Sequence, residues 1–364
     1  MNFGEELEIE ILLRLPLKSL MRFKCVQTSW NNLIKTPYFV NRVTKLSRNR
    51  SLLIIENSKV KLLPREGGDD NEKPILVNSL FPNNLARIES YGSCNGVFCL
   101  KGIYADAKSH GQLIMWNPTT NEVHHISRLP HHEKDFLYGF GAVDGDFKVV
   151  RLITYHCVWK KLLSSFVEVY SLNTKSWTII HTNCPRIDLT DYHPSRYNAL
   201  VNGVYYWIIS SNLNTNPNYA DILSFNFCNN EFGQLQSPIL YVLRSSYLDD
   251  LIEIKGSLGY VLQLNSANNV GFEIWVMDQN KWSRMYAITT STMLNLRRFG
   301  NDAAEIYGGN AGELLESYDH DGNKLHQFQI KIPEGSCAMH MSMCPTYDYF
   351  SIYEYVPTIT LLSK

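Results

Sequence analysis

Six segments of this sequence share one spacing, in which a large apolar residue is followed seven positions later by a second one, with polar residues between them. The pairs are Ile55 and Leu62, Trp116 and Val123, Tyr170 and Trp177, Phe225 and Phe232, Trp275 and Trp282, and Tyr318 and Leu325. The intervening residues are rich in Asn, Asp, Pro, Thr and Gly, which favour tight turns. Each segment therefore predicts a β-hairpin, and the hairpins recur about every 50 residues, the length of one propeller blade.

The runs that precede these hairpins complete the repeat. Apolar, strand-like runs follow Asn95-Gly96, Asp146, Asn202-Gly203 and Lys255-Gly256. Units of about four strands predict a six-bladed β-propeller beyond residue 46, and residues 353–356 and 358–362 are expected to pair with the first blade and close the ring. Two packed antiparallel sheets also contain many short strands rich in aromatic residues, so a β-sandwich is the alternative.

The first forty residues carry a different, helical pattern. Leu7, Ile11 and Leu15 recur every fourth residue, as on one face of a helix. Pro16 is expected to end this helix, because proline disfavours helical geometry in the residue before it. Two more short helices are predicted before residue 40, the last of them near Trp30. The chain is therefore predicted to be α+β by segment, with three short helices followed by an all-β domain, and the apolar helix faces must meet either that domain or a partner.

The order of the residues in this helical segment resembles the F-box, whose signature places Ile-Leu-x-x-Leu-Pro before spaced Leu, Phe, Val and Trp. The chain departs from the signature in two ways, since its opening Leu-Pro is missing and Gln27 stands where cysteine is common. The resemblance implies an F-box domain over residues 1–45 that docks on a Skp-family adaptor. The residues it assigns to adaptor contact are Leu7, Ile11, Leu12, Leu15, Pro16, Leu17 and Leu20, and those it assigns to the F-box core are Phe23, Val26 and Trp30.

The β region contains framework motifs at residues 92–100, 116–122, 139–141, 146–150, 169–172, 176–177 and 273–277. These motifs resemble those of the plant F-box-associated domain. Together with residues 222–226 and 355–359, these motifs look most like the S-locus F-box proteins of pollen.

This resemblance implies that residues 46–364 form a propeller-like substrate-binding domain. The chain would be a non-catalytic substrate receptor of a Skp–cullin–F-box ubiquitin ligase, whose other subunits are a cullin scaffold and a RING subunit. The implied targets are non-self S-ribonucleases, which are ubiquitinated and degraded in pollen tubes. One alternative is an F-box receptor for another plant protein in defence or hormone signalling. A more remote alternative is a β-propeller lectin or enzyme.

Charge is divided unevenly along the chain. Residues 1–50 hold nine Lys or Arg and four Glu. The remaining residues therefore hold 25 basic residues (34 minus 9) and 31 acidic residues (35 minus 4), a net charge of −6. An acidic domain argues against a nucleic-acid partner, which would require a basic surface. We expect the long loops between hairpins to carry recognition, with acidic residues attracting a basic target. The candidates are Asp249, Asp250, Asp302, Glu305, Glu313 and Glu316.

The sequence predicts no catalytic site, cofactor or metal site. Residues 92–96 fit a cysteine version of the nucleophile elbow, but a strand-like run follows them, whereas an elbow requires a helix there. Adjacent His124 and His125 would point to opposite faces of a strand, which does not suit a shared metal ion.

Cysteine usage and hydropathy indicate the compartment. The eight cysteines form no CxxC pair and no disulfide-framework spacing, which predicts a reduced cytoplasmic setting, or a nuclear one. The acidic, polar N-terminus does not resemble a signal peptide. No run approaches the roughly 20 apolar residues of a membrane helix, so no membrane contact is expected.

Overall fold

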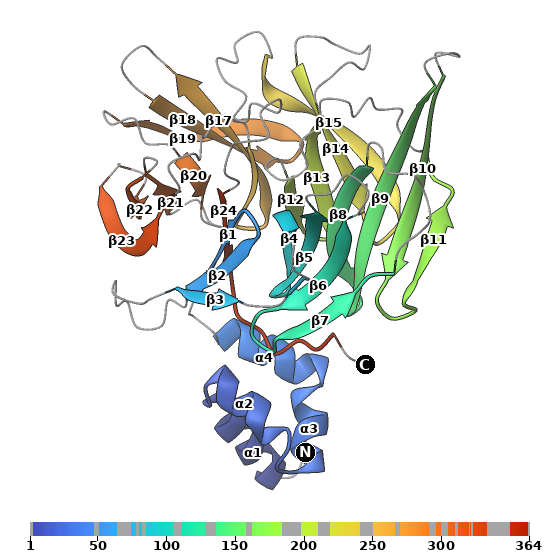
Figure 1. The fold of residues 1–364 in the computed structure, drawn as a ribbon, viewed down its shortest axis with the longest axis vertical. Coiled ribbons are helices and arrows are strands. Elements are labelled where there is room, and N and C mark those ends of the chain that lie inside the picture. Colours follow the sequence, from blue (N-terminus) through green and yellow to red (C-terminus); the bar gives the residue numbers. More distant parts are fainter. Residues whose placement is uncertain are drawn as a thin grey trace.

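The computed structural model describes residues 3–46, 51–63, 74–77, 80–81, 85–104, 111–127, 136–157, 162–183, 198–209, 219–240, 250–265, 270–290, 296–299, 305–309, 312–319, 321, 323–332 and 350–362. Within them a helical region is joined to six β-sheets arranged around a centre, and the helices lie together at one end of the molecule, at the bottom of Figure 1. The helices are α1 (Phe3–Leu13), α2 (Leu17–Phe23), α3 (Thr28–Ile34) and α4 (Pro37–Leu46).

The six sheets form a six-bladed β-propeller, as the sequence repeat predicts, rather than two packed sheets. Each has four antiparallel strands, ordered below from the innermost outward. Blade 1 contains β24 (Phe350–Tyr355), β1 (Ser51–Glu56), β2 (Lys59–Leu63) and β3 (Ile75–Val77); blade 2 contains β4 (Leu85–Cys94), β5 (Val97–Tyr104), β6 (Gln112–Asn117) and β7 (Glu122–His125); blade 3 contains β8 (Phe136–Val143), β9 (Asp146–Cys157), β10 (Leu162–Ser171) and β11 (Ser176–Ile180). Blade 4 contains β12 (Asn198–Val201), β13 (Val204–Ile209), β14 (Tyr219–Asn226) and β15 (Glu231–Leu240); blade 5 contains β16 (Asp250–Ile254), β17 (Ser257–Asn265), β18 (Val270–Asp278) and β19 (Lys281–Thr290); blade 6 contains β20 (Leu296–Phe299), β21 (Ile306–Gly308), β22 (Leu314–Tyr318) and β23 (Lys324–Lys331).

Strands from both ends of the chain close the ring in blade 1. β24 pairs antiparallel with β1, with Tyr353 opposite Leu53. The pairing predicted around Tyr353 is therefore confirmed, but residues 358–362 form no strand and leave the sheet. The predicted equivalence of Ile55 with the other repeated residues is also wrong, because β1 is the second strand of its blade, whereas Trp116 and its four counterparts lie on third strands. The Ile55 hairpin consequently turns on the opposite side of the ring.

Tight turns between first and second strands account for the second marker of the repeat. Asn95 and Gly96, between β4 and β5, both have positive φ, at 48° and 72°. This combination belongs to the type I′ turn, which matches the twist of an antiparallel hairpin. The same signs occur at Asp144-Gly145, Asn202-Gly203 and Lys255-Gly256, so blades 2 to 5 share the turn, and in blade 3 it precedes Asp146 rather than containing it.

Large aromatic residues fill the space between blades 3 and 4. Trp207 of β13 is fully buried, and its Nε1 donates a 2.8 Å hydrogen bond to the backbone oxygen of Tyr138 in β8. Two glycines of β8 make room for this contact, since a Cβ would lie 2.7 Å from the ring of Trp207 at Gly139 and 2.6 Å from the ring of Phe227 at Gly141. The Gly-Phe-Gly motif is therefore a requirement of packing between neighbouring blades.

The helical region has four helices rather than the predicted three, since α4 follows directly after α3. The apolar stripe predicted from the sequence is also not the buried face of α1. Leu7 and Ile11 of α1 are 56% and 52% exposed, whereas Ile9 and Leu12 belong to the buried face of the same helix. Much of the predicted apolar stripe thus lies on the outside of the helical region.

Residues 356–362, which we call the C-terminal strap, contact both the helical region and the propeller. Ile359 is 1% exposed and packs in the hydrophobic core that the helices form. Next to it, Asn117, the last residue of β6, donates a 3.0 Å hydrogen bond from Nδ2 to the backbone oxygen of Thr358. The hydroxyl of Thr358 also shares a 3.3 Å hydrogen bond with that of Thr44 in α4. The strap therefore attaches the helices to the propeller face that carries the turns after the first and third strands, which we call the helix face.

Candidate functional site

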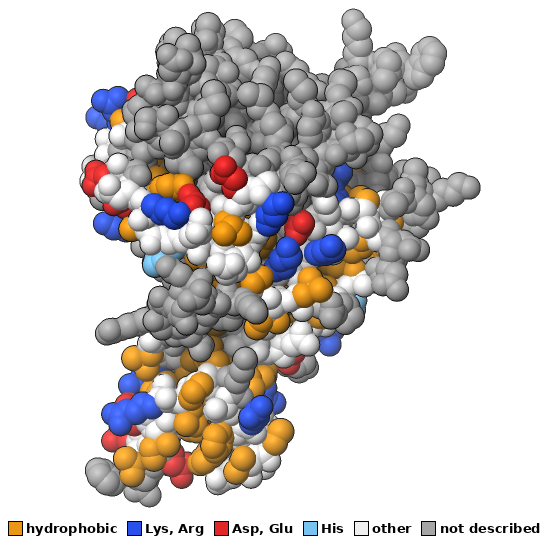
Figure 2. Space-filling view, turned by 60° about the vertical axis from the view of Figure 1, so that its left-hand side comes forward, with side chains coloured by type: hydrophobic (Ala, Val, Ile, Leu, Met, Phe, Trp, Pro, Cys, Tyr) orange, Lys and Arg blue, Asp and Glu red, His pale blue; other side chains and the backbone are white. Residues whose placement is uncertain are grey.

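Exposed apolar side chains gather on the helical region. Leu7 and Ile11 lie one turn apart on α1, so they share a face of that helix, and each is more than half exposed. Val26, in the segment after α2, is 65% exposed. Figure 2 shows many hydrophobic side chains on this end of the molecule. Because contiguous exposed apolar groups mark binding surfaces, we call Leu7 and Ile11 the helical apolar surface.

The other residues predicted to contact an adaptor are placed differently. Leu12 and Leu20 are fully buried in the helical core, so they support the surface from within and do not present atoms to a partner. Leu15 and Leu17 are half-buried against the same core. Pro16 separates α1 from α2, as predicted, and is exposed.

Of the three residues predicted to hold the helices together, two pack against the helical core. The rings of Phe23 and Trp30 have centroids 5.4 Å apart, and Trp30 Nε1 donates a 3.2 Å hydrogen bond to Glu8 Oε2 of α1. The expectation for Val26 is wrong. Since α2 ends at Phe23, Val26 falls in the connection to α3, where its side chain faces solvent.

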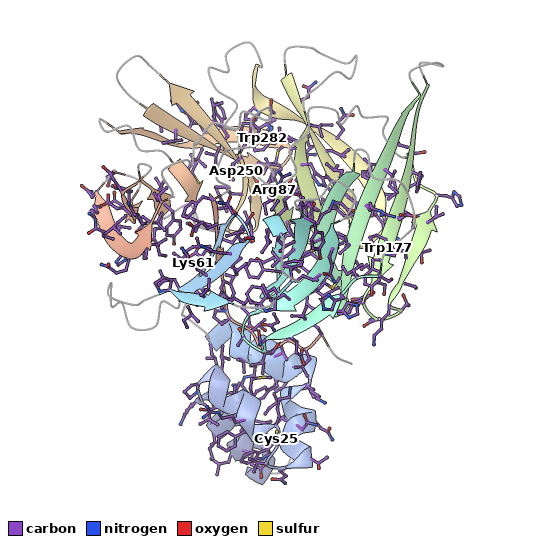
Figure 3. The ribbon with its side chains drawn as sticks, viewed as in Figure 1. Cys25, Lys61, Arg87, Trp177, Asp250 and Trp282 are labelled. Carbon is purple, nitrogen blue, oxygen red and sulfur yellow. The ribbon has the colours of Figure 1, made fainter. Side chains whose placement is uncertain are left out.

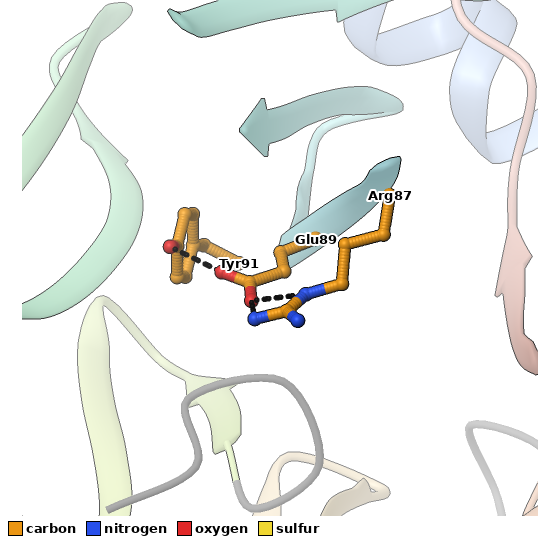
Figure 4. A network of polar contacts seen from close by, with 3 residues as sticks. All are labelled: Arg87, Glu89 and Tyr91. Atoms are coloured by element: carbon orange, nitrogen blue, oxygen red, sulfur yellow. Dashed lines mark hydrogen bonds and ion pairs between the residues drawn. The ribbon is translucent and has the colours of Figure 1, made fainter. Parts of the chain in front are cut away.

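A polar network lies on β4, the innermost strand of blade 2. Figure 3 places Arg87 in the middle of the propeller, far from Cys25 of the helical region. Figure 4 shows Arg87 donating from Nε and Nη2 to Glu89 Oε1, at 3.1 and 2.9 Å, while the hydroxyl of Tyr91 donates to Glu89 Oε2 at 3.1 Å. The three side chains meet because alternate residues of a strand share one face. The side chain of Arg87 is 51% exposed and that of Glu89 only 8%.

Neighbouring blades hold this network in place. Lys101 of β5 lies directly across from Glu89, and its Nζ is 5.2 Å from the ring centre of Tyr138 in blade 3. The ring of Tyr138 packs on that of Tyr91 with centroids 4.9 Å apart. From blade 4, Tyr205 donates a 2.8 Å hydrogen bond to the backbone oxygen of Tyr91. The sequence reasoning missed these residues, although the alternation of Arg87, Glu89 and Tyr91, which is compatible with one face of a strand, was an available signal.

The acidic residues predicted to contact a target do not form one cluster among the described residues. Asp250 begins β16 of blade 5, whereas Glu305, Glu313 and Glu316 belong to blade 6 or its edge. Asp249 and Asp302 lie outside the described residues, as do most of the long loops predicted to carry recognition.

The carboxylate of Glu316, one of these acidic residues, is hydrogen-bonded to side chains of its own blade. Glu316 accepts hydrogen bonds from the side chains of Lys324, Tyr318 and Gln327, the last at 2.8 Å. Burial alone would raise the pKa of the Glu316 carboxyl, but these hydrogen bonds outweigh burial and hold it below its ordinary value. Glu316 therefore stabilises blade 6 rather than presenting a free carboxylate.

The two motifs that hinted at chemistry are structural. The segment around Cys94 and Gly96 is a turn between two strands rather than a strand-to-helix elbow. Burial also raises the pKa of the Cys94 thiol to about 12, which makes it a poor nucleophile. His124 shares a 2.7 Å hydrogen bond with the hydroxyl of Tyr170, whereas His125 bonds to Gln112 of its own blade. Across the described ranges, no three His, Cys, Asp or Glu side chains are grouped so that they could hold a metal ion. None of the four described helices has the length and apolar character needed to span a membrane.

Sequence comparison places the β region in a known family. The F-box associated beta propeller domain matches residues 51–357. An F-box protein of Arabidopsis thaliana is 27% identical over 334 residues, which cover 86% of this chain and 78% of the relative. An F-box/kelch-repeat protein of the same plant is 26% identical over 317 residues, which cover 79% of each chain. Since the family match spans most of the sequence and coincides with the six blades, this chain belongs to the F-box associated β-propeller domain family.

Proposed function

We propose that this protein is the substrate-receptor subunit of a Skp–cullin–F-box ubiquitin ligase. The observation that carries the proposal is the match of residues 51–357 to the F-box associated propeller domain, in a chain whose preceding helices expose an apolar surface. In this proposal residues 1–45 are the F-box domain and residues 46–364 bind the substrate.

The helical apolar surface docks on the Skp-family adaptor, which links the receptor to the cullin scaffold and its RING subunit. At their present exposure, Leu7 and Ile11 each offer roughly 1 kcal/mol of stabilisation on burial. In this proposal Pro16 and the half-buried Leu15 and Leu17 also contact the adaptor, while Leu12 and Leu20 support the surface from inside the helical core. No residue of the receptor performs chemistry, because the subunit acts by holding target lysines near the ubiquitin-charged enzyme.

As the target we propose non-self S-ribonucleases. The support is the resemblance of residues 222–226 and 355–359 to S-locus F-box proteins, together with the net charge of −6 beyond residue 50. That charge attracts basic proteins such as these ribonucleases over long range and speeds their association. Loop residues then discriminate among them, with like charges rejecting the self ribonuclease.

The adaptor role is tested with paired glutamate substitutions. Leu7→Glu with Ile11→Glu places two charges on the helical apolar surface and is expected to reduce capture of a purified Skp-family adaptor at least about tenfold. Leu46→Glu is the matched control, because Leu46 is also 56% exposed but lies at the far end of α4. If the double variant keeps its helical circular dichroism and still captures the adaptor like the control, the ligase role is wrong.

The target is tested separately. The adaptor-bound receptor is measured against a panel of S-ribonucleases over a salt series, and at least one non-self member is expected to bind, with affinity that falls as salt rises. A receptor that captures the adaptor but binds no member of the panel would exclude this target class and leave the ligase role standing.

A further inference from the structure

Arg87 is held in a defined position on the innermost strand of blade 2. Both of its hydrogen bonds go to one oxygen of a carboxylate that is itself almost fully buried, at 2.9 and 3.1 Å. The second oxygen of Glu89 is taken by the buried hydroxyl of Tyr91. The carboxylate therefore cannot rotate without losing a partner, and the guanidinium loses little further freedom when it binds a ligand.

Some N–H groups of this guanidinium form no hydrogen bond among the described residues. Its bonds run from Nε and Nη2, so among the described residues Nη1 has no partner, and Nη2 keeps one N–H free. Two such N–H groups on one edge of a guanidinium match the two oxygens of a carboxylate or of a phosphate. The side chain of Arg87 is about half exposed, so part of it is accessible to a ligand.

A second cation, Lys101, lies on the neighbouring strand β5, two register positions from Arg87. Lys101 is directly across from Glu89 in the neighbouring strand, and its ammonium lies over the ring of Tyr138. Within the described part of the chain, Lys101 forms no ion pair. The cluster of Arg87, Lys101 and Glu89 consequently carries one net positive charge at the centre of a domain that is acidic overall.

The position of the cluster sets it apart from the helical apolar surface. β4 starts near Arg87 and runs to the turn at Gly96, where a Cβ would meet Thr358 of the C-terminal strap. At about 3.3 Å per residue, Arg87 is roughly 23 Å from Cys94, the last residue of β4 before this turn. Arg87 therefore lies toward the face of the propeller opposite the helix face, where a bound protein would not compete with a partner of the helices.

We propose that Arg87 and Lys101 form a recognition site for an anionic group on the target protein, either a carboxylate side chain or a phosphorylated residue in an exposed segment. This inference rests on the proposed receptor function. Arg87 binds the two anionic oxygens through its free edge, Lys101 adds a point charge, and Glu89 and Tyr91 hold the guanidinium in position. Long-range attraction to a basic protein and local recognition of one acidic group are compatible, because the first depends on net charge and the second on contacts within a few ångströms.

The test uses the full chain bound to its adaptor and a library of twelve-residue peptides in three matched series. The first series carries Asp and Glu, the second phosphoserine, and the third the neutral residues Asn, Gln and Ser at the same positions. Comparing the three distinguishes carboxylate from phosphate recognition, and both from binding that needs no negative charge. We expect one anionic series to bind and the neutral series not to bind. Arg87→Gln is expected to weaken binding at least about tenfold and to reduce its salt dependence, and Lys101→Gln to weaken it less.

Arg284 supplies the matched control. It bonds to Glu273 at 2.9 Å, with side-chain exposures of 56% and 15%, close to those of Arg87 and Glu89, but it lies on β19, the outermost strand of blade 5. Arg284→Gln is expected to leave peptide binding unchanged, and Arg87→Lys, which keeps the charge without the fork of N–H groups, is expected to lose most of the affinity. Equal binding of neutral and anionic peptides, no anionic binding at all, or equal losses in the two arginine variants would overturn the proposal. Adaptor capture is measured on the same samples, so failure of this site is distinguishable from failure of the receptor role.

Discussion

Replacing Ile359 by Ala tests whether the C-terminal strap joins the helices to the propeller. Ile359 is 1% exposed and is a strap residue within a core built otherwise from α1 to α4. The substitution removes three buried carbon groups, worth about 0.8 kcal/mol each, and leaves a cavity, so the expected loss is about 3 kcal/mol. Because every 1.4 kcal/mol is a factor of ten, the population in which strap and helices are separated should rise about 100-fold.

Hydrogen exchange followed by mass spectrometry measures this change. Amides of α1 and α4 should lose protection by up to about 100-fold, while those of β5 and β6 should be unaffected. Leu362→Ala is the control from the same strap, since Leu362 is 4% exposed but packs between blades 2 and 3. It should reduce protection in the propeller and spare the helices. Unchanged exchange in the helices of the Ile359 variant would refute the reasoning.

Two further substitutions and one modification test the packing. Gly141→Ala should destabilise the propeller by about 1–3 kcal/mol in denaturant unfolding, since its Cβ would lie 2.6 Å from the ring of Phe227. Gly145→Ala meets no atom within 4 Å and strains only the positive φ, so it should cost about 1 kcal/mol, and the reverse order of the two losses would contradict the packing argument. Iodoacetamide at pH 8 should alkylate the exposed Cys25 in the folded protein and leave Cys94 unmodified, because burial holds the pKa of Cys94 at about 12. Mass spectrometry showing equal modification of both would contradict the burial of Cys94.

The propeller could be predicted from the sequence because each blade repeats the same local requirements. Trp116 and Tyr170 face their hairpin partners in register, and the Asn-Gly turns adopt the positive φ that their residues allow. In the first blade the closure by residues around Tyr353 was predicted, but the position of Ile55 within the blade was not. Ile55 fits the spacing of the repeat, yet strand pairing with β24 places it one strand closer to the centre.

The helical region shows where periodicity stops being informative. A spacing of four residues places Leu7 and Ile11 on one face, but it does not say whether that face is buried. Leu12 is buried in a core that the helices share with Ile359, a residue more than 300 positions away. No local pattern contains that contact.

The candidate recognition site was missed for a related reason. Acidic residues such as Glu316 were selected by counting charges along the sequence, whereas pairing with Lys324 removes that carboxylate from the surface. Arg87 occurs in an ordinary stretch of sequence, and its importance arises from the burial of Glu89 and from the blades that meet around Tyr91.

The C-terminal strap also bears on how the two proposed surfaces work together. A target held near Arg87 and an adaptor held at Leu7 are separated by the depth of the propeller and by the helical region (Figure 1). Under the proposed function, ubiquitin transfer depends on the effective concentration of target lysines at the charged enzyme, and a loose joint between the two surfaces would spread the target over a larger volume. The burial of Ile359 and the hydrogen bond from Asn117 to Thr358 oppose such spreading.

In the Ile359→Ala variant, the rate of ubiquitination of a bound target should therefore fall while the affinities for the target and the adaptor stay the same. A fall in either affinity would show instead that the strap shapes a binding surface, and an unchanged rate would show that the joint does not need to be rigid.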